Sequence, residues 1–399
     1  MNTSCDKNRN KKRIVFAKVL VIVLVALIVV SAWYLLWPKA SNSPNDPNFV
    51  VWHSYPEGSP QAEYIEKTAI PAVEKQHPRL TASAVYYSDD EISDQVLRAK
   101  NEGALPDVIF LNHENMAALA QYGALADLDN EDRLSGLYGG AEPLPERNIA
   151  AGKIGDKRFG LPTEASVQVL LYNPELFSGA GLAPPSGLPE LWNVLETLSS
   201  DGRVYGFVLP DAGMKSLAPF VWSDGGELVS EDGKRADGFL NHGKNIKIFD
   251  RFAAALESGR IFLADGDADA LQLFAEGKAA MTVINANDIS VFKEQYPDSA
   301  FETAPFPKGS AGSVTVLDCK YVCLTISADM NAAASFLEDV LSFFSVPAET
   351  LASARPLPVS YSIRDMNNEF LLAMKQISEG YMTTEEALDE LARKWDAYL

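Results

Sequence analysis

Strand-like and helix-like segments alternate along this 399-residue chain from residue 49 onward. The first strand is predicted at Phe49 to His53, and the Ser59-Pro60 pair that follows is typical of an N-cap and a first helical residue. The same order then repeats, with a strand at 80–87, a helix at 89–101, a strand at 107–111 and a helix at 114–122. Strands that alternate with helices predict an α/β fold with a parallel sheet.

A second α/β region follows Gly160-Leu-Pro-Thr-Glu-Ala165, and the Thr383-Thr-Glu-Glu386 stretch opens the last helix in the manner of a capping box. Because single cores seldom exceed 100–200 residues, the length favours two lobes. Ligands of parallel sheets bind beyond the carboxyl ends of the strands. That rule directs attention to the loops at 54–58 and 112–114.

The charge is distributed unevenly. Residues 1–18 carry a net charge of +5, so the remainder carries −25 against −20 overall. Residues 19–37 form an apolar run interrupted only by Ser31, close to the ~20 residues that span a bilayer. A basic segment before such a run stays in the cytoplasm, which predicts an extracytoplasmic, acidic body. The acidic balance also argues against a nucleic-acid partner.

The apolar run is interpreted as an uncleaved transmembrane anchor, with a cleaved signal sequence as the alternative. The aromatic residues Trp33, Tyr34 and Trp37 at its end are typical of a membrane interface. Residues 38–48 are polar and rich in Ser, Asn and Pro, and are predicted to form a linker.

Signatures of catalysis, metal binding and disulfides are missing from the sequence. No G-x-S-x-G, H-E-x-x-H, P-loop or C-x-x-C motif occurs, and the four histidines lack metal-ligand spacing. Cys319 and Cys323 lie on a predicted strand at 314–326, about 13 Å apart at ~3.3 Å per residue, and are expected to be unbridged and buried. The chain is therefore predicted to be no enzyme and to need neither metal nor cofactor, although a glycosidase carboxylate pair stays open as an alternative.

Nine short segments in a fixed order resemble the extracellular solute-binding proteins of ABC importers, in the large family that takes sugars, oligosaccharides and glycerol phosphates. The segments are Val51-Trp-His-Ser-Tyr55, Leu105-Pro-Asp-Val-Ile-Phe110, Tyr122-Gly-Ala-Leu-Ala-Asp-Leu128, Phe159-Gly-Leu-Pro-Thr163, Leu171-Tyr-Asn-Pro-Glu-Leu-Phe177, Trp222-Ser-Asp-Gly-Gly226, Phe274-Ala-Glu-Gly-Lys-Ala-Ala-Met281, Phe306-Pro-Lys-Gly309 and Leu357-Pro-Val359. The resemblance covers residues 49–399.

The resemblance implies a two-lobed periplasmic-binding-protein fold of type II, in which the chain crosses between the lobes three times. The crossings are expected near 163–166, 304–307 and 345–356. Lobe one would then comprise 49–163 plus 308–347, and lobe two 165–303 plus 352–399. A cleft between rigid lobes can bury most of a small ligand as the lobes close.

The resemblance also implies a set of ligand-binding residues in that cleft: Tyr55, Glu57, Asn112, Glu114, Glu164, Ser166, Lys215, Trp222, Asn285, Asn287, Gly312 and Arg355. Glu114 matches a carboxylate that holds sugar hydroxyls, Lys215 and Arg355 could bind an anionic group, and Gly312 could offer its backbone N–H.

Most of these roles have a structural alternative. Tyr55 and Glu57 could belong to an exposed turn, Glu114 could face a helix dipole, and Glu164 and Ser166 could pack in the hinge. Lys215 and Arg355 could be solvated, and Trp222 lies in an apolar helix that could bury it in the core. Asn285 and Asn287 stand where many relatives carry an aromatic residue, which argues against a maltose-like stacking platform.

The sequence thus predicts a monomeric, membrane-anchored solute-binding component of an ABC transporter, which captures a carbohydrate or a polyol phosphate and delivers it to a permease. The alternatives are a ligand sensor on the same scaffold and a secreted glycoside hydrolase.

Overall fold

The three strands that begin the globular part of the chain pair in parallel, as the alternation of strands and helices predicts. In the computed structural model, which describes residues 48–130, 152–200, 202–344, 354–358 and 360–399, β1 (Asn48–His53) lies between β2 (Thr81–Tyr86) and β3 (Val108–Asn112). Its register places Trp52 opposite both Val85 and Ile109. The carboxyl ends of these strands therefore lie at one edge, where the sequence places the loops 54–58 and 112–114.

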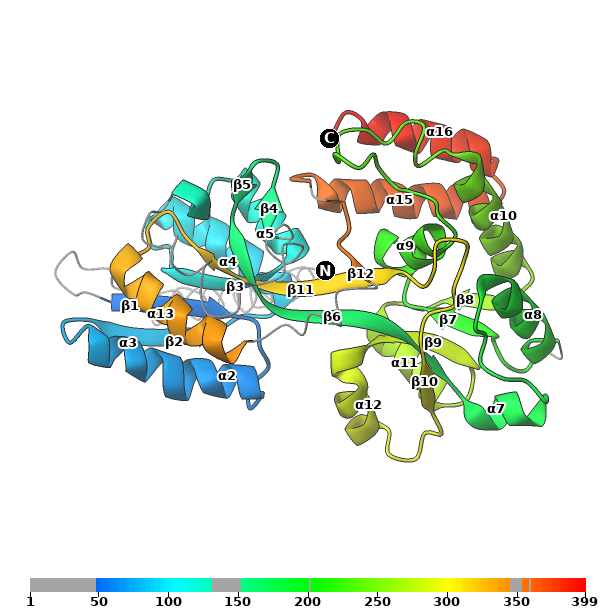
Figure 1. The fold of residues 1–399 in the computed structure, drawn as a ribbon, viewed down its shortest axis with the longest axis horizontal. Helices are drawn as coiled ribbons and strands as arrows, with labels where there is room; N and C mark the ends of the chain where they lie inside the picture. The colour runs from blue at the N-terminus through cyan, green and yellow to red at the C-terminus, as the bar shows by residue number, and fades with distance from the viewer. Residues whose placement is uncertain (1–47, 131–151, 201, 345–353, 359) are drawn as a thin grey trace, which may run out of the picture. The chain divides into compact units, whose positions relative to one another are not determined.

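Two long strands continue this sheet and are shared by two lobes (Figure 1). The first half of β6 (Gly160–Tyr172) pairs with β11 (Thr315–Leu324), and its second half pairs with β9 (Met281–Asn285) and β10 (Glu302–Ala304). β11 in turn pairs with β3. We call the part built on β1–β3 lobe one and the part built on β7–β10 lobe two.

The start of the helix after β1 is predicted from the sequence of its N-cap. Ser59 accepts from the backbone N–H of Ala62, and Pro60 occupies the first turn of α2 (Pro60–Tyr64). The helix then widens into the π-helical turn η1 (Ile65–Ala69) before α3 (Ile70–Gln76). Pro71 has no N–H to donate to the preceding turn, which accounts for the interrupted α-helical pattern.

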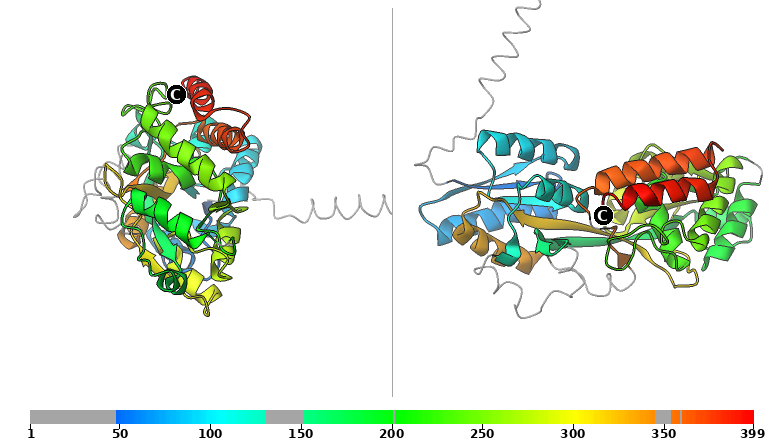
Figure 2. Two further views of the ribbon diagram at one scale, coloured as in Figure 1. Left: turned by 90° about the vertical axis from the view of Figure 1, so that its right-hand side faces the viewer. Right: turned by 90° about the horizontal axis from the view of Figure 1, so that it is seen from above.

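Helices of both lobes are held by their packed faces and end caps. The predicted capping box is confirmed, since Thr383 and Glu386 bond reciprocally at the start of α16 (Thr384–Trp395). α15 (Ile363–Ser378) and α16 lie side by side (Figure 2). Trp395 is fully buried between them and donates to the Met366 carbonyl.

The remaining elements with described positions are helices, the two-stranded sheets β4–β5 and β7–β8, and the short strand β12, which pairs with β11. In lobe one they are α4 (Asp89–Glu102), α5 (His113–Gln121), η2 (Leu128–Asn130), β4 (Lys153–Ile154), β5 (Lys157–Arg158) and α13 (Met330–Phe343). In lobe two they are α7 (Pro174–Gly179), α8 (Leu188–Leu198), β7 (Phe207–Leu209), α9 (Met214–Ser223), α10 (Gly243–Glu257), β8 (Ile261–Leu263), α11 (Asp267–Ala275), η5 (Ala286–Asp288), α12 (Ile289–Gln295) and β12 (Ala354–Arg355).

The second passage between the lobes lies later in the chain than the sequence predicts. Residues 304–307 were expected to cross, with lobe one resuming at 308. Instead, Lys308 exchanges backbone hydrogen bonds with Ser186 and Leu188, and Ala311 donates to the Ser223 carbonyl. A Cβ at Gly309 would lie 2.3 Å from that carbonyl oxygen, so only glycine fits there. Residues 308–314 thus pack on lobe two, and β11 makes the passage.

Other predictions concern residues whose positions are not described. The expected third crossing falls largely on 345–353. The apolar segment 19–37, its flank 1–18 and the predicted linker up to residue 47 lie before the described part of the chain, and the last predicted linker residue, Asn48, begins β1. Within the described residues, none of the helices combines the length and the apolar character that spanning a bilayer requires. Cys319 and Cys323 are unbridged and buried, as predicted.

Candidate functional site

A polar seam lies on the two strands that the lobes share. On β6, Glu164 and Ser166 are separated by one residue, and they stand opposite Lys320 and Asp318 of β11. We use the name polar seam for these four residues. Because alternate residues of a strand point to one face, the four side chains share a face. The intervening Ala165 and Cys319 face the other way and are buried.

Lobe one contributes the loops at the carboxyl ends of its strands. Lys320 Nζ lies 2.8 Å from Ser54 Oγ and 3.2 Å from an Asp89 carboxylate oxygen. Ser54 Oγ also donates to Asp89 at 2.6 Å. These contacts join the end of β1, the start of α4 and β11 into one network, which fixes the orientation of Lys320.

Tyr55 and Gln61 complete the lobe-one side of the seam. The Tyr55 hydroxyl is 3.2 Å from Thr163 Oγ1, and Lys320 Nζ lies 4.8 Å from the centre of its ring. Tyr55 is only 3% exposed, and its hydroxyl contacts the equally buried Thr163. Gln61 Nε2 donates to Glu164 Oε1 at 3.0 Å.

Lobe two reaches the same seam from α9 and from the end of β9. Lys215 Nζ is 2.7 Å from Asp318 Oδ2, and Asn285 Nδ2 donates to the same oxygen at 3.2 Å. The backbone N–H of Asn287 donates to Ser166 Oγ at 3.3 Å. Side chains of both lobes therefore meet on strands that belong to both.

The charges of the seam alter one another's ionisation. Burial favours neutral Lys215 and neutral Asp318, but each charge stabilises the other more strongly. The pKa of Lys215 is therefore raised and the pKa of Asp318 lowered. Burial raises the pKa of Glu164, an effect that Lys320 only partly offsets. Desolvation likewise raises the pKa of Asp288, next to Asp318 and Asp267.

Two buried acceptors next to the seam have no hydrogen-bond donor among the described residues. Gln168 is 5% exposed and follows Glu164 and Ser166 on the same face of β6, with its Oε1 unpartnered. It stands opposite Asn285, whose Oδ1 is also unpartnered. Unsatisfied buried acceptors are costly in a folded protein, so these atoms indicate a place where a ligand donor can bind.

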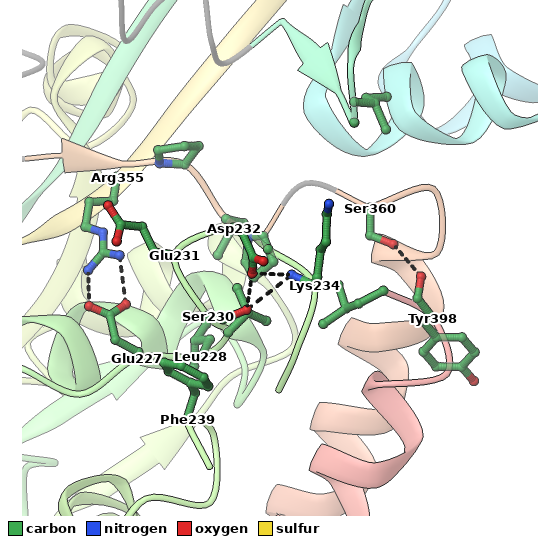
Figure 3. Close-up of a pocket in the computed structure, with 18 of the residues that line it drawn as sticks. Glu227, Leu228, Ser230, Glu231, Asp232, Lys234, Phe239, Arg355, Ser360 and Tyr398 are labelled. Carbon is green, nitrogen blue, oxygen red and sulfur yellow. Dashed lines mark hydrogen bonds and ion pairs between the residues drawn. The ribbon is translucent and has the colours of Figure 1, made fainter. Parts of the chain in front are cut away.

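A cavity of about 920 Å³ lies beside Trp222 and Arg355 (Figure 3). Arg355 forms a two-pronged ion pair with Glu227 at 3.0 and 2.8 Å, and its guanidinium carbon lies 5.1 Å from the centre of the Trp222 ring. The loop at 227–235, the segment around Ser360 and the β4–β5 turn form the other walls. Lys215 and Trp222 are seven residues apart on α9, about 10.5 Å at 1.5 Å per residue.

The candidate residues named from the sequence are distributed between these two places. Residues at the polar seam or bonded to it are Tyr55, Glu164, Ser166, Lys215, Asn285 and Asn287. Trp222 and Arg355 line the cavity. Trp222 is only 3% exposed, so it lies in the core as the structural alternative proposed.

The other four candidates have mainly local contacts. The Asn112 side chain caps α5 by accepting from the Asn115 N–H, and Glu114 lies in the first turn of that helix. Glu57 lies on an exposed loop. The N–H of Gly312 is directed to the Gly309 carbonyl within a turn, and its φ of 106° suits only glycine. For these residues, ligand binding stays a prediction.

Sequence reasoning missed the groups at the centre of the seam, Asp318 and Lys320. The signal was present in the printed sequence, because two charged residues one position apart interrupt an apolar strand, Val314-Thr-Val-Leu-Asp-Cys-Lys-Tyr-Val-Cys-Leu324. Charges on one face of a buried strand require partners, which is a reason to expect a site. Asp89, Gln61 and Asp288 had no comparable signal.

Two α/β lobes joined by shared strands, with polar groups of both lobes meeting on those strands, define a ligand-binding protein of the two-lobed kind. Residues 68–345 match the model of the bacterial extracellular solute-binding protein family. The chain belongs to this family, which confirms the resemblance seen in its sequence. The family places its members outside the cytoplasm.

Curated relatives are distant and only partly aligned. A putative binding protein of Brucella abortus is 24% identical over 281 residues. The match covers 63% of this chain, and the chain spans 63% of that relative's length. The diacetylchitobiose-binding protein DasA of Streptomyces coelicolor is 28% identical over 43% of this chain and 38% of its own. The galactooligosaccharide-binding protein of Bacillus subtilis is 25% identical over 64% of this chain and 59% of its own.

Solved structures support the fold over nearly the whole described chain. The GacH receptor of Streptomyces glaucescens, solved unliganded and with acarbose, superposes with a TM-score of 0.72 at 20% identity, covering 89% of this chain and 98% of that one. The cyclic α-maltosyl-1,6-maltose-binding protein of Arthrobacter globiformis gives 0.72 at 19% identity, with 88% and 99% covered. At such identities the likeness establishes the two-lobed fold.

Proposed function

We propose that this protein is the substrate-binding component of an ABC transporter and that it captures a carbohydrate between its lobes. The observation that supports this most is the polar seam, where Lys215 of lobe two and Lys320 beside Ser54 of lobe one contact neighbouring carboxylates. A ligand bound there touches both lobes at once, and this is the condition for closure to be driven by binding.

The chemistry of the seam suits hydroxyl groups. Carboxylates, side-chain amides and hydroxyls of Glu164, Asp318, Asn285 and Ser166 can accept and donate hydrogen bonds in fixed directions. The relatives support the same class, since two of them are named for binding diacetylchitobiose and galactooligosaccharide. The polyol-phosphate alternative is less well supported, because Lys215, Lys320 and Arg355 are each paired with a carboxylate.

In this function the protein makes and breaks no covalent bond. The ligand would donate hydrogen bonds to the unpartnered acceptors Gln168 Oε1 and Asn285 Oδ1 and would bring the two lobes together. β6 and β11 would carry the motion between the lobes, and the closed form would dock on a permease whose partner hydrolyses ATP. The cavity beside Trp222, two helical turns along α9, gives room for a ligand longer than one sugar ring.

We also propose that residues 19–37 anchor the protein in the cytoplasmic membrane, with residues 1–18 inside and a monomeric body outside. The hydrophobic run and its basic flank support this arrangement. The lobe boundaries we propose keep 163–166 and 345–356 as crossings and replace 304–307 by β11.

A thermal-shift panel tests the proposed function. The purified protein is heated with maltotriose, diacetylchitobiose, a galactooligosaccharide, glycerol 3-phosphate or spermidine. At least one carbohydrate should raise the melting temperature, because a ligand at 100 times its Kd stabilises by about 2.7 kcal/mol. Stabilisation by none of the carbohydrates would contradict the proposed ligand class.

A further inference from the structure

The polar seam and its immediate surroundings carry more negative than positive charge. Asp318 and Glu164 lie on the shared strands, Asp89 pairs with Lys320, and Asp267 and Asp288 act on Lys215 through space. Against these five carboxylates stand two lysines, Lys215 and Lys320, so the carboxylates of this group outnumber its cations by three. Like charges held together in a partly desolvated site repel, which favours a ligand that reduces the surplus.

Both lysines are already occupied by carboxylates. Lys215 lies 2.7 Å from Asp318, and Lys320 contacts Asp89 and Ser54. An anionic ligand would have to displace one of these partners. Glu164 and Asp288, by contrast, receive their side-chain hydrogen bonds from the neutral amides of Gln61 and Asn285. In the part of the chain that the structure describes, no cation forms an ion pair with either of these two carboxylates.

Two buried amide oxygens near these carboxylates have no hydrogen-bond donor among the described residues. Gln168, more than nine-tenths buried, presents an unpartnered Oε1 on the face of β6 that carries Glu164, and Asn285 beside it presents an unpartnered Oδ1. Both of these unmet amide oxygens are acceptors. An ammonium group only donates, carries one positive charge and can donate to three acceptors at once.

We infer that the carbohydrate bound at the polar seam carries a protonated amine, as an amino sugar or a short amino-sugar oligomer does, and that Glu164 and Asp288 receive this amine. The inference rests on the proposed function and deepens it. A charge-assisted hydrogen bond is about twice as strong as a neutral one, so the amine would contribute both to affinity and to selectivity. Burial raises the pKa of Glu164, and a bound cation would favour its ionised form.

A matched pair of probes tests this inference. Chitobiose with two free amines and diacetylchitobiose have the same rings and linkage and differ in the charge at the nitrogen atoms. Isothermal titration of the purified protein, at a pH where the amines are protonated, should give a Kd lower by roughly tenfold or more for the free amine. High salt should weaken binding of the amine form and leave the acetylated form nearly unchanged.

Three variants assign the effect to the named carboxylates. Glu164→Gln and Asp288→Asn keep the shape and remove the charge, and each should reduce the ratio of the two affinities several-fold. Glu257→Gln, an exposed position on α10, is the control and should leave the ratio unchanged. Equal or tighter binding of diacetylchitobiose, or a ratio unchanged in both seam variants, would overturn the inference while the proposed function stands. Failure of every carbohydrate to bind would overturn both.

Discussion

The polar seam and the cavity beside Trp222 both contain an ion pair, but they differ in what the pair connects. Lys215 and Asp318 join a lobe-two helix to a strand shared by the lobes, and each side chain is about a third exposed, at 38% and 34%. Arg355 and Glu227 pair on the surface of lobe two, at 44% and 41% exposed. The first pair is placed to respond to lobe movement.

The two regions also differ in what lies beneath them. Under the Arg355–Glu227 pair, Trp222 is packed among buried apolar residues of α9, so its ring stabilises the lobe. At the seam, several buried residues are polar: Ser166 and Gln168 on β6 and His53 at the end of β1 are each less than a tenth exposed. A region with unmet buried polar groups is better suited to exchange its contacts with a ligand than a region built on a closed apolar core.

The largest expected effect on stability comes from a substitution beside the cavity. Trp222→Ala should lower the free energy of unfolding by about 3–5 kcal/mol, because a large aromatic side chain is removed from a packed core. Chemical denaturation followed by circular dichroism measures it. Trp222→Phe is the matched control and should retain most of the stability. A loss below about 1 kcal/mol for Trp222→Ala would mean that the ring is free to stack on a ligand.

The second prediction concerns the stability of the protein at mildly acidic pH, which depends on two buried histidines near the seam. Burial lowers the pKa of His53, next to Glu66, Lys320 and Tyr55, and it lowers the pKa of His113, next to Asp318 and Pro358. The unfolded chain therefore binds more protons than the folded chain below the ordinary histidine pKa of about 6.5. Stability should fall as the pH is lowered through this value, by up to about 1.4 kcal/mol per pH unit for each histidine.

Unfolding curves measured from neutral pH to mildly acidic pH check this slope. Glu164 and Asp288, whose pKa values are raised by burial, act in the opposite direction, over a range that extends upward from the ordinary pKa of a carboxyl group. His53→Gln should flatten the slope, because it removes one of the two buried histidines whose pKa is lowered. A profile independent of pH in this range would contradict the prediction.

Much of the fold is readable from the sequence because it depends on local patterns. The parallel order of β1–β3, the Ser59 cap and the Thr383 capping box follow from residues close in the chain. The length of β6 cannot be predicted from such local patterns, because Pro162 lies inside the strand and a proline argues against a strand interior. The return of the chain along β11 depends on the packing of Gly309 against Ser223, a contact between distant segments.

The site residues at the ends of strands and helices were predictable from the sequence, whereas the pairing at the centre of the seam was not. Tyr55, Lys215 and Asn285 stand at strand or helix ends, where general rules expect ligands. The pairing of Glu164 with Lys320 across two strands is a matter of register, which the sequence does not specify. The position of a bulge between Lys320 and Tyr321 decides which side chains share the face, and no local signal marks it.

A smaller effect is expected from separating the inter-lobe ion pair. A double-mutant cycle with Lys215→Met and Asp318→Asn should give a coupling energy of about 1–2 kcal/mol in the free energy of unfolding. The value is below that of a fully buried pair because both side chains are about a third exposed and are screened by solvent. The same variants should weaken carbohydrate binding. A coupling near zero, with binding unchanged, would remove this pair from the site.

The smallest effect is expected from the pair in the cavity, and it completes the comparison. The cycle of Arg355→Met with Glu227→Gln should give a coupling energy of about 0.2–1 kcal/mol, because both side chains are well exposed and most of the attraction is lost to solvent and salt. The two-pronged geometry and the contact with Trp222 favour the upper part of this range. Titration of each variant with the carbohydrate that stabilises the wild-type protein provides the second readout. Unchanged affinity is expected if the seam alone holds the ligand, and a loss of about tenfold or more would show that the bound molecule extends along α9 into the cavity.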